Sequence, residues 1–171
     1  LKVPALEIQQ GPHRRLYSFA VDGKKLRDFT TVSRVRRDEQ NSMQGYQRPE
    51  VLSHIAEIKN YIESKNPMIP NALVVAFDER VRFEPAAGTS STDYCRVGTL
   101  VIPVHANEAE EEKTGWIVDG QQRAAAIREA EIGSFPICVT AFITGDQDAQ
   151  REQFILVNST KPLPRSLIYE L

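Results

Sequence analysis

Five consecutive residues, Asp119-Gly120-Gln121-Gln122-Arg123, combine the residue types that phosphate binding requires. They follow the apolar run 116–118 and precede an Ala-rich segment of high helix propensity, so a strand, a turn and a helix are predicted. Gly120 permits a backbone conformation closed to other residues. The start of a helix offers unpaired N–H groups and a partial positive charge, to which the two glutamines add amide donors and Arg123 a guanidinium. We therefore expect Gly120, Gln121, Gln122 and Arg123 to bind phosphate.

A solvated polar turn between strand and helix is the simpler alternative. The segment matches neither common Gly-rich phosphate signature, because no second glycine follows at either spacing. In phosphoryl transfer the protein positions water and stabilises the oxygens, and Asp119 is placed to orient water or a metal ion. If the bound phosphate belongs to a nucleotide that is hydrolysed, Asp119 and Arg123 are the candidate catalytic residues.

Two further polar segments flank predicted helices. Gln47 and Arg48 precede one helix, and Asn158 to Lys161 follow another. If both segments fold back onto the phosphate site, Gln47, Arg48 and Lys161 contact the phosphates, and Asn158 joins Asp119 around a magnesium ion. The alternative is that Arg48 and Lys161 are surface charges at helix ends.

The apolar periodicity predicts an α+β fold with a small mixed sheet and three or four helices packed around it. Expected strands cover residues 3–9, 16–21, 73–77, 95–104, 116–118 and 135–143, with 95–104 paired to 116–118. Expected helices cover residues 50–65, from 123 to about 133, 146–157 and from 164 onward. Residues 24–44 are expected to form a loop or short helices, and 78–94 a loop. The buried stripe of the helix at 50–65 is predicted to hold Val51, Leu52, Ile55, Ile58 and Ile62.

The size and composition favour one domain over residues 1–171, with 41% hydrophobic residues to form its core. No apolar run approaches the roughly 18 residues of a membrane helix, and no signal segment opens the chain, so we expect a cytoplasmic protein. Cys95 and Cys138 stand singly in strand-like runs and are expected to be buried free thiols. The chain lacks an initial methionine and stops inside a helix-like pattern, which indicates a fragment of a longer protein.

Charge is distributed unevenly around a net value of -2. The first 50 residues hold ten Lys and Arg against six Asp and Glu, whereas the remainder holds eleven against seventeen. The basic part overlaps an N-terminal β unit at residues 1–44 and offers candidate DNA contacts at Arg14, Arg15, Arg34, Arg36 and Arg37. A solvated basic face is the alternative. The acidic segment 107–113 is expected to be a solvated turn rather than a metal site.

Residues 117–123, together with Gln47-Arg48, Phe135-Pro136-Ile137 and the segment 154–164, resemble DGQHR-domain proteins of the ParB/sulfiredoxin-like superfamily. The resemblance covers roughly residues 45–171, with Gln122 in place of the motif's histidine. The same spelling occurs in DUF262 proteins, the nucleotide-hydrolysing parts of restriction systems that attack modified DNA. Those proteins usually continue with Leu-Thr, where this chain has Ala124-Ala125.

The resemblance implies a ParB/sulfiredoxin-like domain that binds or hydrolyses ATP, in some members binds DNA, and acts with other proteins in DNA modification. We expect Mg²⁺ to offset the charge of the phosphates. The modification is phosphorothioation or insertion of 7-deazaguanine bases. In the superfamily, the residues that match Gly120 to Arg123 hold phosphates, whereas sulfiredoxin's reactive cysteine would fall at Gln121, which rules out that chemistry. Two alternatives stay open: a non-enzymatic DNA-binding transcriptional regulator, and a protein adaptor with a vestigial nucleotide site.

Overall fold

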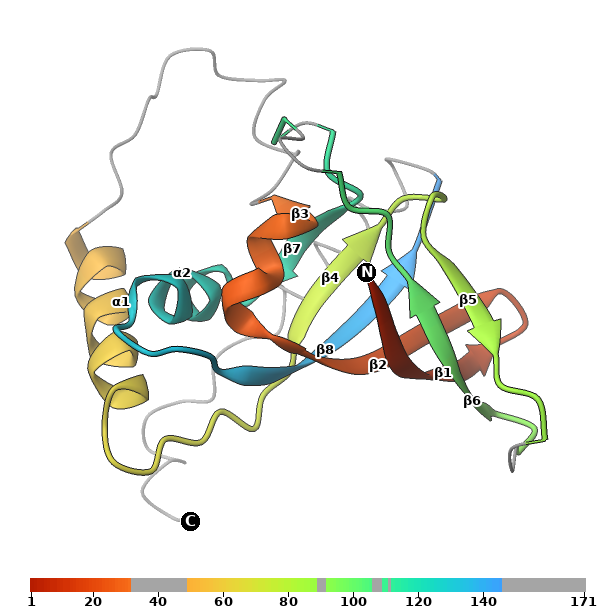
Figure 1. Ribbon diagram of the computed structural model, residues 1–171, viewed down its shortest axis with the longest axis horizontal. Helices are drawn as coiled ribbons and strands as arrows, with labels where there is room; N and C mark the ends of the chain where they lie inside the picture. Colours follow the sequence, from red (N-terminus) through yellow and green to blue (C-terminus); the bar gives the residue numbers. More distant parts are fainter. Residues whose placement is uncertain (32–48, 89–91, 106–108, 111, 146–171) are drawn as a thin grey trace.

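The computed structural model describes residues 1–31, 49–88, 92–105, 109–110 and 112–145 (Figure 1). These residues form a mixed α+β fold. Its strands are β1 (Lys2–Gly11), β2 (Arg14–Asp22), β3 (Thr30–Thr31), β4 (Leu73–Phe77), β5 (Arg82–Pro85), β6 (Cys95–Val101), β7 (Gly115–Asp119) and β8 (Pro136–Ile143). Its helices are the 3-10 helix η1 (Gly23–Asp28), α1 (Pro49–Ile62) and α2 (Gln121–Glu129).

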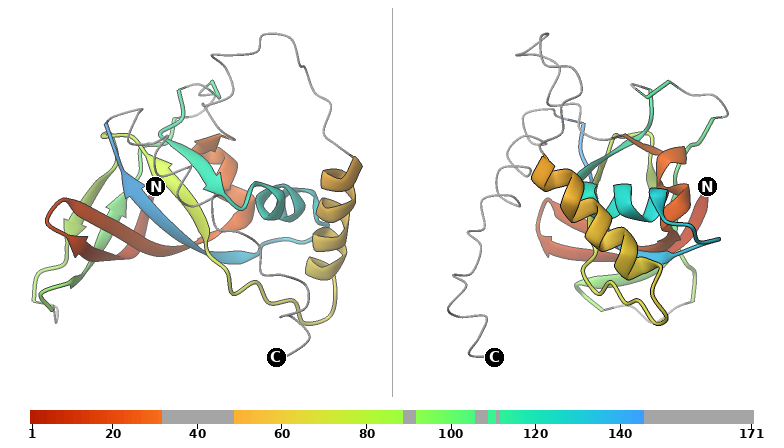
Figure 2. Two further views of the ribbon diagram at one scale, coloured as in Figure 1. Left: turned by 180° about the vertical axis from the view of Figure 1, so that it is seen from behind. Right: turned by 90° about the vertical axis from the view of Figure 1, so that its left-hand side faces the viewer.

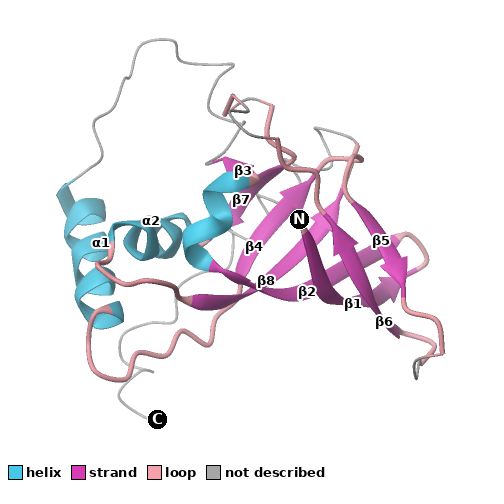
Figure 3. Ribbon diagram, in the orientation of Figure 1, coloured by secondary structure: helices cyan, strands magenta, loops and turns pink. Residues whose placement is uncertain are grey.

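One curled sheet holds all eight strands, in the order β3-β7-β4-β8-β2-β1-β6-β5. The pairs β3–β7 and β4–β8 are parallel, and the other neighbours run antiparallel. The helices gather at one end of the molecule, where α2 contacts both η1 and α1 (Figures 2 and 3). The buried core fills the space between this helical end and the sheet, and its fully buried members include Phe29, Leu73, Phe77, Ile127 and Val139.

Most of the predicted elements are confirmed. The strands expected at 3–9, 16–21, 73–77, 116–118 and 135–143 are β1, β2, β4, β7 and β8. Pro49 opens α1, which ends at Ile62 rather than at residue 65. The strand, turn and helix around Gly120 are present, although α2 ends at Glu129, short of the expected residue 133. The helices predicted at 146–157 and from 164 lie outside the described residues.

The predicted pairing of the strand at 95–104 with 116–118 is wrong. β6 pairs with β1 and β5, while β7 pairs with β3 and β4. Burial gives the reason: β7 is buried along nearly its whole length, whereas β6 is exposed near its start and alternates between buried and partly buried positions toward its end. A strand covered on both faces lies inside the sheet beside a similarly buried neighbour, here β4. β5 was missed, because its segment was expected to be a loop.

Three side chains predicted to be buried are not. Leu52 is 51% exposed, since α1 packs mainly against α2 and only a narrow stripe that includes Ile55 and Ile62 is covered. Cys138 is exposed and Cys95 is partly exposed, and both are free thiols. In β8 the alternation places Ile137 and Val139 in the core, so Cys138 faces the other side of the sheet.

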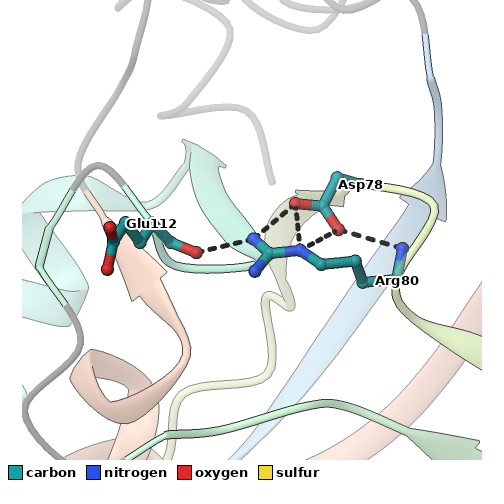
Figure 4. A network of polar contacts seen from close by, with 3 residues as sticks. All are labelled: Asp78, Arg80 and Glu112. Carbon is teal, nitrogen blue, oxygen red and sulfur yellow. Dashed lines mark hydrogen bonds and ion pairs between the residues drawn. The ribbon is translucent and has the colours of Figure 1, made fainter.

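A polar network fixes the start of β7 (Figure 4). The guanidinium of Arg80 donates to the Asp78 carboxylate, with 2.8 Å between Nη2 and Oδ2, and to the main-chain oxygen of Glu112 at 2.6 Å. The amide of Asp78 donates to the oxygen of Thr114 at 2.9 Å. These contacts tie the turn after β4 to the segment that enters β7, and so position the strand that ends in Asp119.

Within the described residues, no helix is long and apolar enough to cross a membrane.

Candidate functional site

Gly120 makes the turn between β7 and α2. Its backbone has φ 90° and ψ 20°, in the left-handed region that favours glycine. A Cβ added to Gly120 would also overlap the Leu73 side chain of β4. The first intrahelical bond of α2 runs from the amide of Ala124 to the oxygen of Gly120 at 2.9 Å, and no side chain caps the helix start. The N–H groups that precede this bond are therefore available to an anion.

Arg123 is held by protein acceptors at the start of α2. Its Nη1 donates to the main-chain oxygens of Asn71 at 2.5 Å and Ala72 at 3.3 Å. Its Nη2 donates to Asp119 Oδ2 at 3.1 Å. The Arg123 side chain is 20% exposed, and that of Asp119 is 42% exposed. The guanidinium thus joins the segment before β4 to the end of β7, and direct contact of Arg123 with phosphate stays a prediction.

The two glutamines of the motif differ in their surroundings. Gln121 folds back, and its Nε2 donates to the main-chain oxygens of Val118 at 2.8 Å and Ile117 at 3.2 Å. Those bonds use the amide donors that were expected to serve a ligand. Gln122 lines the adjacent groove, and within the described part of the chain its side chain has no hydrogen-bond partner. Of the two, Gln122 is the residue whose side chain is available to a ligand.

A groove of about 530 Å³ opens at the start of α2. One wall is polar and consists of the five motif residues, Asp119 to Arg123. The opposite wall is formed by His54, Ile58 and Tyr61 of α1, with Ile69 from the following connection. Sequence reasoning missed this wall. Of these residues, only Ile58 belonged to the predicted buried stripe. His54 and Tyr61 share its side of the helix at helical spacing, which is the signal that could have found the wall.

Contacts at both helices hold the groove in shape. The amide of Glu131, just beyond α2, donates to Glu63 Oε1, just beyond α1, at 2.7 Å. Lys24 of η1 donates from Nζ to the main-chain oxygens of Ala130 at 2.5 Å and Arg128 at 3.1 Å, at the end of α2. A lysine at this end also complements the partial negative charge of the helix. The side chain of Lys24, one of the basic residues near the N-terminus, thus has a structural role.

The other predicted site residues lie away from the groove or outside the described residues. Arg14 and Arg15 are exposed at the start of β2. The β1–β2 turn that precedes them lies at the end of the sheet far from α1 and α2 (Figures 1 and 2). The remaining predicted contacts are outside the described residues: Arg34, Arg36, Arg37, Gln47, Arg48, Asn158 and Lys161. Among the residues that the structure describes, no three His, Cys, Asp or Glu side chains are grouped to hold a metal ion.

Three perturbed pKa values belong to groups outside the groove. The N–H of Phe135 is the main cause that lowers the pKa of Asp22, with help from the amide of Lys24. A hydrogen bond from Lys113 lowers the pKa of Glu110. Burial raises the pKa of Tyr17, and the neighbouring Glu7 carboxylate adds to this effect. These groups join elements of the fold to one another, so their shifts have structural causes.

Comparison with known proteins identifies the family. The DndB family model, described as DNA-sulfur modification-associated, matches residues 3–170. Neither a curated protein nor a solved structure matches the chain. The match favours phosphorothioation among the two modifications that the resemblance implied, and it implies that other DNA-modification proteins are partners. The chain belongs to the DndB family of DNA-sulfur modification-associated proteins.

Proposed function

We propose that this component of a DNA phosphorothioation system binds a nucleoside triphosphate, ATP in the first instance, in the groove between α1 and α2. The observation that carries the proposal is the uncapped start of α2, which opens into a groove of about 530 Å³ beside Arg123. Pockets for small ligands typically enclose about 300–1,000 Å³. The resemblance to ParB/sulfiredoxin-like nucleotide-binding domains supports the same site.

In this proposal the phosphates lie against the first N–H groups of α2 and the amide of Gln122. The helix dipole favours negative charge there. Among the described residues, the first turn of α2 contains no acidic side chain. Arg123 adds positive charge from the polar wall of the groove while it donates to the main-chain oxygens of Asn71 and Ala72.

ATP hydrolysis is the further part of this proposal. Mg²⁺ is commonly bound through one or two carboxylates together with the phosphates of the substrate. Asp119 lines the groove and fits this role as a single carboxylate, with the predicted Asn158 as a second ligand. The ion would offset phosphate charge. Asp119, once released from Arg123, would orient the attacking water.

Substitution of Gln122 by Glu tests phosphate binding without loss of the fold. A carboxylate in the first turn of α2 favours the helix dipole, so the melting temperature should stay level or rise. The same charge repels phosphate, and we expect the ATP affinity to fall about tenfold or more by calorimetry. Arg128→Glu is a control that adds negative charge at the opposite, exposed end of α2.

Equal ATP affinity in the wild type and in Gln122→Glu would overturn the phosphate site. A wild-type melting temperature that is unchanged by ATP and Mg²⁺ would instead indicate an adaptor with a vestigial site, because a ligand of the folded state must stabilise it. Phosphate release, measured in the same samples, separates hydrolysis from binding.

A DNA-binding transcriptional regulator is the second candidate function. The observation that favours it is the exposure of Arg14 and Arg15, next to the β1–β2 turn and remote from the groove. A regulator of this kind should bind DNA with an affinity that falls steeply as the salt concentration rises, because binding releases counterions. Arg14→Gln with Arg15→Gln should reduce both the affinity and the salt slope. A double variant with wild-type salt dependence would exclude these two arginines from the interface.

A further inference from the structure

We propose that the α1 wall of the groove, formed by His54, Ile58, Tyr61 and Ile69, holds the nucleobase of the ligand whose phosphates lie at α2. This inference rests on the proposed function. It assigns to the ligand a flat, largely apolar ring at the end opposite its charge, and it makes Tyr61 a specificity-determining residue.

The side chain of Tyr61 is fixed while its ring stays accessible. Its hydroxyl accepts from the amide of Met68 at 2.9 Å and donates to the main-chain oxygen of Met68 at 3.0 Å. Both polar needs of the hydroxyl are thereby met by the chain. Tyr61 is nevertheless 47% exposed, so a large part of it is not covered by the core. A ring that is already held in place loses little conformational freedom when a ligand stacks on it.

The surroundings of Tyr61 favour a flat partner. Ile58 and Ile69 are partly buried, and both pack against the core while they line the groove. Residues 54, 58 and 61 share one side of α1, so the rings of His54 and Tyr61 follow one another along that side of the helix. His54 is exposed, and its Nδ1 lies 3.4 Å from Glu57 Oε2 in a solvent-exposed pair. Its imidazole can therefore turn to meet the polar edge of a base.

The two walls of the groove differ in charge and polarity. The wall at α2 offers N–H groups, Gln122 and the Arg123 guanidinium with its partner Asp119, whereas the wall at α1 offers rings and aliphatic side chains. A ligand that matches both walls carries an anion at one end and an apolar ring at the other, as a nucleotide does. Aromatic stacking tolerates every base, because each has a π face. The wall thus predicts that nucleotides bind in preference to bare polyphosphate.

The test compares ATP with inorganic triphosphate by calorimetry on the full chain. Tyr61→Leu removes the ring and keeps an apolar side chain, and we expect its ATP affinity to fall about tenfold with triphosphate affinity unchanged. Tyr61→Phe keeps the ring and loses only the bonds to Met68, so its ATP affinity should stay within about threefold of the wild type. Tyr94→Leu is the matched control, since Tyr94 is 65% exposed and does not line the groove.

The outcomes separate this inference from the proposed function. A wild-type chain that binds neither ATP nor triphosphate contradicts the proposed function itself. A chain that binds both, with an ATP-to-triphosphate affinity ratio unaltered in Tyr61→Leu, overturns the base-binding wall alone. If Tyr61→Leu fails to fold, His54→Ala at an exposed position of the same wall gives the comparison, and an unaltered ratio there has the same meaning.

Discussion

Arg123 Nη2 lies 3.1 Å from Asp119 Oδ2, so the last residue of β7 pairs with the guanidinium at the start of α2. Both side chains line the groove. The carboxylate occupies a donor that a phosphate could use, and it places a like charge beside any anionic ligand. Binding at this site therefore competes with an ion pair that the protein already contains.

Asp119→Asn should strengthen nucleotide binding in the absence of magnesium. It removes the competing charge, and an ion pair of this exposure is worth about 0.2–1 kcal/mol, so with the lost repulsion we expect a gain of about three- to tenfold in affinity. Calorimetry in the presence of EDTA measures it. Phosphate release should fall in the same variant. Asp93→Asn, at an exposed site in the β5–β6 connection, is the control. Weaker binding in EDTA would contradict the competition.

Arg123→Met should destabilise the fold as well as the site. The change removes the donor to the carbonyl oxygens of Asn71 and Ala72, and because water can reach the exposed Asn71 oxygen we expect a loss of about 0.5–1.5 kcal/mol in the free energy of unfolding. Urea denaturation gives the value. Arg128→Met removes an exposed arginine that pairs only with Glu129 among the described residues, and it should change stability by less than about 0.5 kcal/mol. Equal losses in the two variants would refute the anchoring role.

Gly120→Ala should cost more than Gly88→Ala, although both glycines have positive φ. The left-handed conformation costs about 1–2 kcal/mol for an L-residue at either position. At Gly120 the added Cβ also overlaps Leu73, whereas a Cβ at Gly88 meets no atom of the described residues within 4 Å. Overpacking adds about 1–3 kcal/mol to the cost at Gly120. Thermal unfolding of both variants measures the difference, and equal melting temperatures would show that Leu73 moves aside freely.

Asp22 should make stability depend on acid pH. The N–H of Phe135 lies 3.0 Å from Asp22 Oδ1 and lowers the pKa of this carboxyl in the folded state. The resulting stabilisation is complete above the unfolded-state pKa of about 4 and is lost as pH falls through the lower folded-state value. Asp22→Asn should therefore be less stable than the wild type at pH 7, and the difference should shrink upon acidification. Asp28→Asn, exposed in η1, is the control; an identical acid profile for Asp22→Asn and the wild type would contradict the linkage.

The strands and helices could be predicted largely because their patterns are local. The alternation of Ile137 and Val139 locates the buried face of β8, and Gly120 marks the turn before α2. Strand pairing was not predictable in the same way. Whether β6 lies beside β7 or β1 depends on which surfaces the whole chain buries, and β5 is too short and polar for its pattern to distinguish it from a loop.

The candidate site was predicted from only one of its walls. The sequence predicted a site at Asp119 to Arg123 because glycine, amide and guanidinium groups are adjacent there. Tyr61 and His54 did not, because each looks ordinary within a helix and becomes part of a groove only when α1 packs on α2. The hydrogen bond from Arg123 to Asn71 likewise depends on a tertiary contact, and the one from Gln121 to Val118 depends on the local geometry of the turn at Gly120. Residue types alone reveal neither bond.

The place of β1 inside the sheet has a kinetic consequence. β1 can pair early with β2 across a short turn, but its other edge waits for β6, and Leu1 donates to the oxygen of Ile102, 101 residues away. Domains dominated by such distant pairings fold slowly, in milliseconds to seconds, since the connecting chain must be closed before the contacts form. Until β6 arrives, the β1–β2 hairpin presents an unpaired edge, which is the stage at which association between chains competes with folding.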